Sequence, residues 1–144
     1  MVRVCLNCGA NPKIANKHGL NILMTASQNR HLEIVKHLIL CGADVNANSN
    51  GLTALMWAAR FEHSEIVKHL VLQGANINAI EYRDGTTALI RSAENGKLEM
   101  VKCLVSLGAD INVSDMGGRT ALSWALERNY PKIANYLKAN GARL

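Results

Sequence analysis

The chain repeats itself at nearly constant intervals over its 144 residues. The dipeptide Gly-Ala starts at positions 9, 42, 74, 108 and 141, so the steps are 33, 32, 34 and 33 residues. A second series keeps the same interval, as Asn21-Ile22-Leu23, Thr53-Ala54-Leu55, Thr87-Ala88-Leu89 and Thr120-Ala121-Leu122. Repeats of this length are typical of solenoids, in which each unit packs on its neighbours.

One unit in the middle of the chain shows what each repeat is expected to form. Thr53 is a favoured N-cap for a first helix over residues 54–60. A second helix is expected over residues 64–73, where apolar side chains recur at helical spacing. Gly74 can end that helix, because glycine adopts positive φ readily. The polar segment 76–83 suits a hairpin-like loop. A single unit of this kind leaves an apolar face uncovered, so neighbouring units must stack on it.

These motifs resemble the ankyrin repeat. The clearest matches are Gly42-Ala43-Asp44-Val45-Asn46-Ala47, His31-Leu32-Glu33-Ile34-Val35-Lys36 and Gly108-Ala109-Asp110-Ile111-Asn112. The resemblance implies an all-α solenoid of stacked helix-turn-helix units joined by hairpin-like loops. We expect a single ankyrin-repeat domain over residues 1–144, with a half repeat at 1–16 and full repeats at 17–48, 49–81, 82–115 and 116–144.

The turn between the two helices of each repeat departs from the family pattern. The family places a glycine there, and this chain keeps it only as Gly96. Asn129 tolerates left-handed backbone, whereas Arg30 and Glu62 carry a Cβ that makes positive φ unfavourable. We therefore expect strained turns after the first helices of the first two full repeats.

The two ends of the chain differ in how they would close the stack. The last helix begins at Pro131, which suits a first helical turn, and its exposed positions are polar. Residues 1–16 begin inside a second helix and lack a first helix to cover it. Two explanations remain: the chain is a fragment of a longer array, or another surface covers this end. We expect a monomer or weak self-association through the uncapped N-terminal end.

Composition narrows the class of protein. Apolar residues make up 49% of the chain and charged residues 19%, so it can bury a core and is not disordered. It has neither the run of about 18 apolar residues that a membrane helix needs nor an apolar signal-peptide segment. We expect an intracellular protein, cytoplasmic or nuclear. The relaxed repeat consensus is also compatible with a microbial protein secreted toward a host.

The four cysteines are expected to be structural thiols in a reducing compartment. Cys5 and Cys8 form a CxxC pair, but no second pair or histidine pair at zinc-ligand spacing follows. Cys8 and Cys41 occupy equivalent places one repeat apart. Stacked helices lie about 10 Å apart, beyond the roughly 7 Å Cα separation that a disulfide can bridge. We therefore expect no metal and no intramolecular disulfide.

Catalytic motifs are missing from the sequence. It contains no glycine-rich phosphate loop, nucleophile elbow or His-Glu-x-x-His segment. His37 and His69 occupy equivalent places in adjacent second helices, too far apart to share a metal. We predict no catalytic, cofactor-binding or metal-binding residue and no small-molecule substrate, and therefore a protein that is not an enzyme.

Binding to another protein is the function that the resemblance implies. In ankyrin-like stacks the first helices and loop tips line a concave face. Carried over by position, the partner-binding residues are Trp57, Arg60, Phe61, Tyr82, Arg83, Arg91, Glu94, Trp124, Glu127 and Arg128, with Met116 and Arg119 at further loop tips. Trp and Arg are enriched in interface hot spots. The alternative for Trp57 and Trp124 is that they pack between first helices as rim core.

An alternative function is binding of nucleic acid or another anionic surface by the arginines of the same face. The net charge of +5 is a weak indication in its favour. Glu94, Glu127 and Asp84 interrupt the basic patch. We therefore predict a non-enzymatic protein–protein interaction module whose partner the sequence does not identify.

Overall fold

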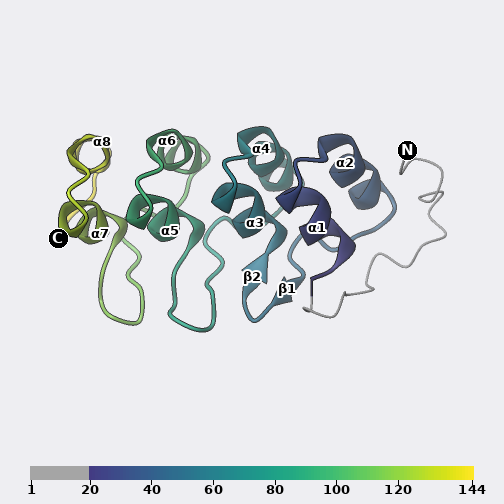
Figure 1. Cartoon of the computed structure of the whole chain (residues 1–144), viewed down its shortest axis with the longest axis horizontal. Helices are drawn as coiled ribbons and strands as arrows, with labels where there is room; N and C mark the ends of the chain where they lie inside the picture. The colour runs from purple at the N-terminus through teal and green to yellow at the C-terminus, as the bar shows by residue number, and fades with distance from the viewer. Residues whose placement is uncertain (1–19) are drawn as a thin grey trace. The chain divides into compact units, whose positions relative to one another are not determined.

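The computed structural model describes residues 20–144, which form helix pairs joined by loops (Figure 1). It divides into two compact units between Asn76 and Ile77, with unit 1 before this point and unit 2 after it. Unit 1 contains α1 (Ile22–Gln28), α2 (Leu32–Leu40), β1 (Asn48–Ser49), β2 (Leu52–Thr53), α3 (Ala54–Arg60) and α4 (Ser64–Leu72). Unit 2 contains α5 (Ala88–Glu94), α6 (Leu98–Ser106), α7 (Ala121–Glu127) and α8 (Pro131–Ala139).

Each first helix starts at a side-chain cap. Thr53, Thr87 and Thr120 lie in extended backbone and accept a hydrogen bond from the backbone N–H three residues later. Asn21 does the same before α1. Such a cap stabilises a helix by about 1 kcal/mol. The expected first helix over residues 54–60 is confirmed, and the second ends at Leu72, one residue short of the expected boundary.

The turns inside the helix pairs all use left-handed backbone. Arg30, Glu62 and Asn129 have φ of 62°, 61° and 59°, and Gly96 has φ of 73°. The expectation of strained turns at Arg30 and Glu62 is confirmed. A non-glycine residue in this region costs on the order of 1 kcal/mol, which the packing of the flanking helices must offset.

Apolar side chains between the helices form the core of each unit. In unit 1, α1 packs on α3 and each first helix packs on its second helix. Leu23, Leu38, Leu55, Ile66 and Leu70 are fully buried there. In unit 2, α5 packs on α7 in the same way, around the fully buried Leu89, Ile90, Met100, Leu104, Leu122 and Ile133.

The loops between helix pairs are ordered by local turns and by bonds to the next repeat. In unit 1, β1 and β2 pair antiparallel. The two residues between them, Asn50 and Gly51, both have positive φ, as a tight hairpin turn requires. The Asn46 side-chain amide donates to the carbonyl oxygen of Gly74 at 3.1 Å, and its Oδ1 accepts the backbone N–H of Asn76 at 2.7 Å. Asn112 in unit 2 bonds Gly141 O and Arg143 N at 3.2 and 2.9 Å in the same way.

The cysteine prediction is wrong for Cys41, which is disulfide-bonded. The separation of stacked helices was the basis of that prediction. Cys41 is the C-cap of α2, where the chain leaves the helix, and a spacing taken between helix axes does not describe this position. Cys103 is a buried thiol of α6. Cys5, Cys8 and the half repeat 1–16 lie outside the described residues.

None of the helices in residues 20–144 has the length and apolar character that crossing a membrane requires.

Candidate functional site

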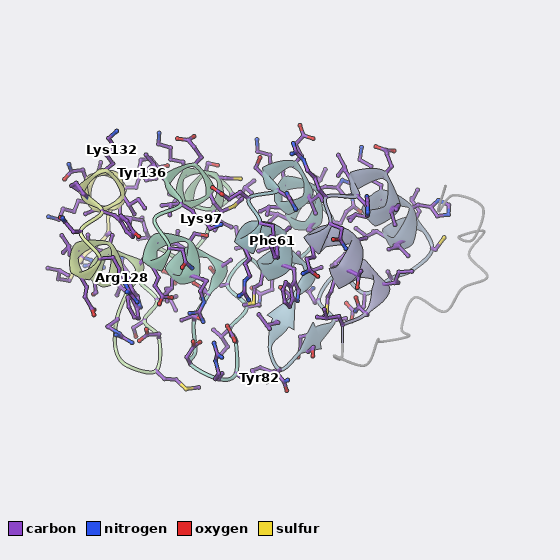
Figure 2. All side chains as sticks on the ribbon, viewed as in Figure 1. Phe61, Tyr82, Lys97, Arg128, Lys132 and Tyr136 are labelled. Atoms are coloured by element: carbon purple, nitrogen blue, oxygen red, sulfur yellow. The ribbon has the colours of Figure 1, made fainter. Side chains whose placement is uncertain are left out.

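In unit 1, α3 presents a cluster of aromatic and cationic side chains. The rings of Trp57 and Phe61 stack with centroids 6.4 Å apart and an interplanar angle of 11°. The Arg60 guanidinium carbon lies 5.5 Å from the Trp57 ring centroid, within cation–π range. Phe61, labelled in Figure 2, is 45% exposed. The structure thus brings these three predicted residues together, and we call them the α3 cluster.

Two further groups support the α3 cluster. His63 also stacks with Phe61, with ring centroids 6.3 Å apart. Its Nε2 lies 3.0 Å from the carbonyl oxygen of Gln28, which ties the ring to the end of α1. Sequence reasoning missed His63, although its place just before the second helix matches that of His31. The Trp57 indole N–H is buried and has no hydrogen-bond partner among the described residues.

In unit 2, Arg91 on α5 is the centre of an ion-pair network. Its Nη2 donates to Glu81 at 2.9 Å, to Asp84 at 2.6 Å and to the Thr86 hydroxyl at 2.7 Å. Its Nη1 donates to Glu94 at 2.8 Å. Both Arg91 and Glu94, predicted as partner contacts, are therefore engaged with side chains of their own unit.

The Arg91 network shifts the proton affinity of its members. Burial by itself raises the pKa of Asp84, but hydrogen bonds from Thr86 and Arg91 outweigh it and lower the pKa from 3.8 to about 2. Burial likewise disfavours the charged Arg91, yet bonds to Asp84, Glu81 and Glu94 hold its pKa above the ordinary value. Asp84 and Arg91 are therefore both ionised at neutral pH, and their contact anchors the first loop of unit 2, residues 77–87, to α5.

Trp124 on α7 is held by the second loop of unit 2, residues 107–120. Its indole N–H donates to Asp115 Oδ2 at 2.9 Å, and the residue is only 7% exposed. The Arg119 guanidinium carbon lies 3.7 Å from the ring centroid, and that of Arg128 lies 5.3 Å away. The sequence left open whether the two tryptophans face a partner or pack as rim core. Trp124 is buried, as the rim-core alternative predicts, whereas Trp57 is half-buried.

Asp115 is the main group at this site that sequence reasoning missed. Its Oδ1 accepts the backbone N–H of Gly117 and Arg119 at 2.8 and 2.9 Å. Burial raises the pKa of Asp115, but these bonds, that from Trp124 and the Arg119 charge lower it below the ordinary value. The repeat offered one signal in the sequence that could have identified Asp115, namely that equivalent positions of two repeats make equivalent contacts. Arg91 and Trp124 are both the fourth residue of a first helix, and a carboxylate of the preceding loop bonds each.

The remaining predicted residues of unit 2 lie at exposed positions. Tyr82 is at the tip of the first loop, and Arg128 lies beside α7 (Figure 2). Arg83 is 77% exposed, and its Nη2 lies 3.5 Å from Glu81. Arg128 approaches Glu94 at 3.4 Å, and Glu127 lies 3.8 Å from Arg119.

A cavity of about 450 Å³ opens between the two loops of unit 2. Arg83 and Asp84 line it from the first loop, Asp115, Met116 and Arg119 from the second, and Arg91, Glu94 and Trp124 from the first helices. This volume is in the range of ligand pockets, about 300–1,000 Å³. We call it the inter-loop pocket. The predicted loop-tip residues Met116 and Arg119 belong to it.

Comparison with known protein families agrees with this geometry. Residues 1–81 and 65–144 each match the family model described as ankyrin repeats in three copies. A comparison with curated proteins finds no match to this chain. Ankyrin repeat domains are generally protein-binding modules and are typically non-catalytic.

Proposed function

The chain belongs to the ankyrin repeat family, and from this premise we propose that it is a non-enzymatic module that binds a partner protein. The contacting surface is the one formed by first helices and loop tips. In unit 1 it is centred on the α3 cluster of Trp57, Arg60 and Phe61. In unit 2 its exposed members are Tyr82, Arg83 and Arg128. Arg91 and Trp124 act as positioning residues that hold the loops on their helices.

The α3 cluster carries this proposal. The exposed Phe61 ring stacks with both Trp57 and His63 and is already held in place, so binding would immobilise little more of it. Burying a ring of this size removes apolar area from water, worth about 1.5–3 kcal/mol for a full side chain. Arg60 adds a cation beside the ring, and Trp and Arg are the residue types most often found in hot spots.

The test begins with an affinity pull-down, in which the full chain captures the partner from a lysate of the cells that produce this protein. Mass spectrometry then identifies the partner. Calorimetry then compares Phe61→Ala and Arg60→Ala with the wild type. Each substitution is expected to weaken binding by about 1–3 kcal/mol if it removes a hot spot. Both side chains are at the surface, so the urea midpoint should change little.

The matched control is Lys68→Ala, an exposed cation of α4 in the same unit. It should leave the affinity unchanged, as should Lys102→Ala on α6, which only pairs with Glu99 at 3.3 Å. If the two lysine variants weaken binding while the Phe61 and Arg60 variants do not, the partner uses the second-helix side and the assignment of the surface is wrong.

A further inference from the structure

We propose that the inter-loop pocket of unit 2 binds one carboxylate side chain, Asp or Glu, of a partner protein. This inference rests on the proposed function and names the chemistry of one contact in it. The pocket's volume of about 450 Å³ exceeds what a single side chain needs. It therefore has room for the carboxylate and part of the neighbouring chain.

The carboxylates of the pocket already hold donors from their own unit. Asp115 accepts two backbone N–H groups through Oδ1 and the Trp124 indole through Oδ2. Asp84 accepts the backbone and hydroxyl of Thr86 through Oδ1 at 3.1 and 2.7 Å, and Arg91 through Oδ2. A carboxylate oxygen accepts about two hydrogen bonds well. By this rule about three of the four acceptor positions of each aspartate are occupied, so about one position on each Oδ2 remains for a cationic ligand.

Two guanidinium groups of the pocket keep donors available. The Arg119 Nε is buried and has no hydrogen-bond partner among the described residues, although Asp115 Oδ2 lies 3.5 Å away. Its Nη1 lies 3.8 Å from Glu127. Arg83 lies 3.5 and 4.0 Å from Glu81 and Asp84. These separations exceed the usual N–H···O distance of about 2.7–3.2 Å, so the Nη atoms of both arginines can donate to an incoming oxygen. The Arg119 Nε is buried and lies out of reach of a ligand.

The Arg119 side chain is also held in place before a ligand arrives. Its guanidinium carbon lies 3.7 Å from the Trp124 ring centroid, and the side chain remains 43% exposed. Trp124 is itself fixed by its bond to Asp115. A planar guanidinium held on an aromatic face presents its N–H fork with little further loss of side-chain freedom.

The charge of the lining disfavours a dianion more strongly than a singly charged anion. Three lining arginines, Arg83, Arg91 and Arg119, face three lining carboxylates, Asp84, Glu94 and Asp115, so the lining is neutral. A phosphate dianion would leave two uncompensated negative charges, whereas a carboxylate leaves one and matches the planar fork of arginine. Met116, 68% exposed at the rim, provides apolar contact for a residue beside the acidic one.

The probe is a capped Leu-Glu-Leu tripeptide titrated into the isotope-labelled full chain, with the Trp124 indole resonance followed by NMR. Its comparators replace Glu by Gln, Lys or phosphoserine. We expect a saturable shift of the Trp124 signal, with the Glu peptide binding at least about fivefold tighter than the others, as for a hydrogen bond to a charged group. Trp57 is the internal reference and should not shift in parallel.

Variants show which side chains hold the carboxylate. Arg119→Gln and Arg83→Gln should each abolish most of the Glu-over-Gln preference, and Arg119→Lys should retain part of it. Because the Arg83 side chain is largely exposed, Arg83→Gln should fold, and it tests the inference even if Arg119→Gln does not fold. The matched control is Arg143→Gln, which removes an exposed arginine of unit 2 that does not line the pocket. It should leave the preference intact.

Several outcomes would overturn the inference. One is equal binding of the Glu and Gln peptides, and another is tighter binding of the Lys or phosphoserine peptide. A Glu-over-Gln preference that survives Arg83→Gln and Arg119→Gln would also contradict it. So would the absence of a saturable shift up to about 10 mM peptide, which corresponds to negligible affinity. A partner whose affinity depends on Phe61 but on neither Arg83 nor Arg119 would leave the proposed function standing while this inference fails.

Discussion

At the residue scale, the four turns that join the two helices of each pair all have a residue in left-handed backbone, and only at Gly96 is this residue a glycine. The reason lies in the neighbouring side chain as well as in φ. A Cβ placed on Gly96 would lie 2.7 Å from Tyr130 Cζ. At Gly108 φ is +93° and no atom lies within 4 Å of the added Cβ. Gly96 is therefore required for space, whereas Gly108 is required only for its backbone conformation.

This difference predicts that Gly96→Ala destabilises the protein more than Gly108→Ala does. Positive φ costs each variant about 1–2 kcal/mol. Overpacking against Tyr130 should add about 1–3 kcal/mol for Gly96→Ala alone. The measurement is the free energy of unfolding in urea for both variants, with Tyr130→Ala added to each. Equal losses in the two single variants would mean that the Tyr130 ring moves aside without cost.

At the scale of elements, the loops of unit 2 are attached to its first helices by ionised groups. Asp84 and Arg91 join residues 77–87 to α5 at 2.6 Å. Asp115 and Trp124 join residues 107–120 to α7 at 2.9 Å. In both cases the aspartate lies in the loop and its donor is the fourth residue of the helix. Loop position in this unit therefore depends on carboxylates that must stay charged.

Acid should consequently weaken unit 2 in a defined pH window. The pKa of Asp84 falls from 3.8 to about 2 in the folded chain, so folding favours its charged form. The resulting stabilisation is complete above about pH 4 and is lost as the pH falls toward about 2. We expect Asp84→Asn to be less stable at pH 7 and to show a flatter loss of unfolding free energy across this window.

Urea unfolding at a series of pH values measures this effect, with Glu99→Gln, which alters an exposed pair on α6, as the control. The control should retain the wild-type slope. An unchanged slope in Asp84→Asn would mean that the Asp84–Arg91 contact does not favour the ionised carboxyl.

At the scale of the whole molecule, the net charge of +5 invites comparison with nucleic-acid-binding proteins. Most of the arginines that would carry such binding lie near acids, which offset their positive charge. Arg83, Arg91, Arg119 and Arg128 each lie within 4.0 Å of at least one carboxylate of unit 2. A phosphate backbone would have to compete with Glu81, Asp84, Glu94, Asp115 and Glu127. This pairing favours the protein-binding function over the anionic-surface alternative.

We therefore expect only weak, non-specific binding of duplex DNA. In fluorescence anisotropy at about 0.15 M salt, the dissociation constant of a short labelled duplex should be no tighter than about 1 µM, as for non-specific binders. Lowering the salt should strengthen binding without sequence preference. Sub-micromolar affinity with a steep salt dependence would instead support the alternative function.

The parts of the fold that were predictable depend on local signals. Thr53 caps α3 and Gly74 follows α4 with φ of 93°, because caps and positive-φ glycines act within a few residues of the helix end. The interval of the Gly-Ala series indicates stacking, since one unit cannot cover its own apolar face. Disulfide bonding at Cys41 depends on which groups meet in space, and sequence spacing misled the prediction there.

The candidate site shows the same division. From the sequence alone, periodicity places Trp57 and Trp124 at equivalent positions of first helices. Their different environments arise only in the folded chain. The Trp124 indole donates to Asp115, while that of Trp57 is buried without a partner among the described residues. The ligand that the inter-loop pocket can bind likewise depends on which of its arginines already have close hydrogen-bond partners. Repeat identity is a local, periodic property of the chain, whereas burial, pairing and residual donor capacity are set by residues that tertiary packing brings together.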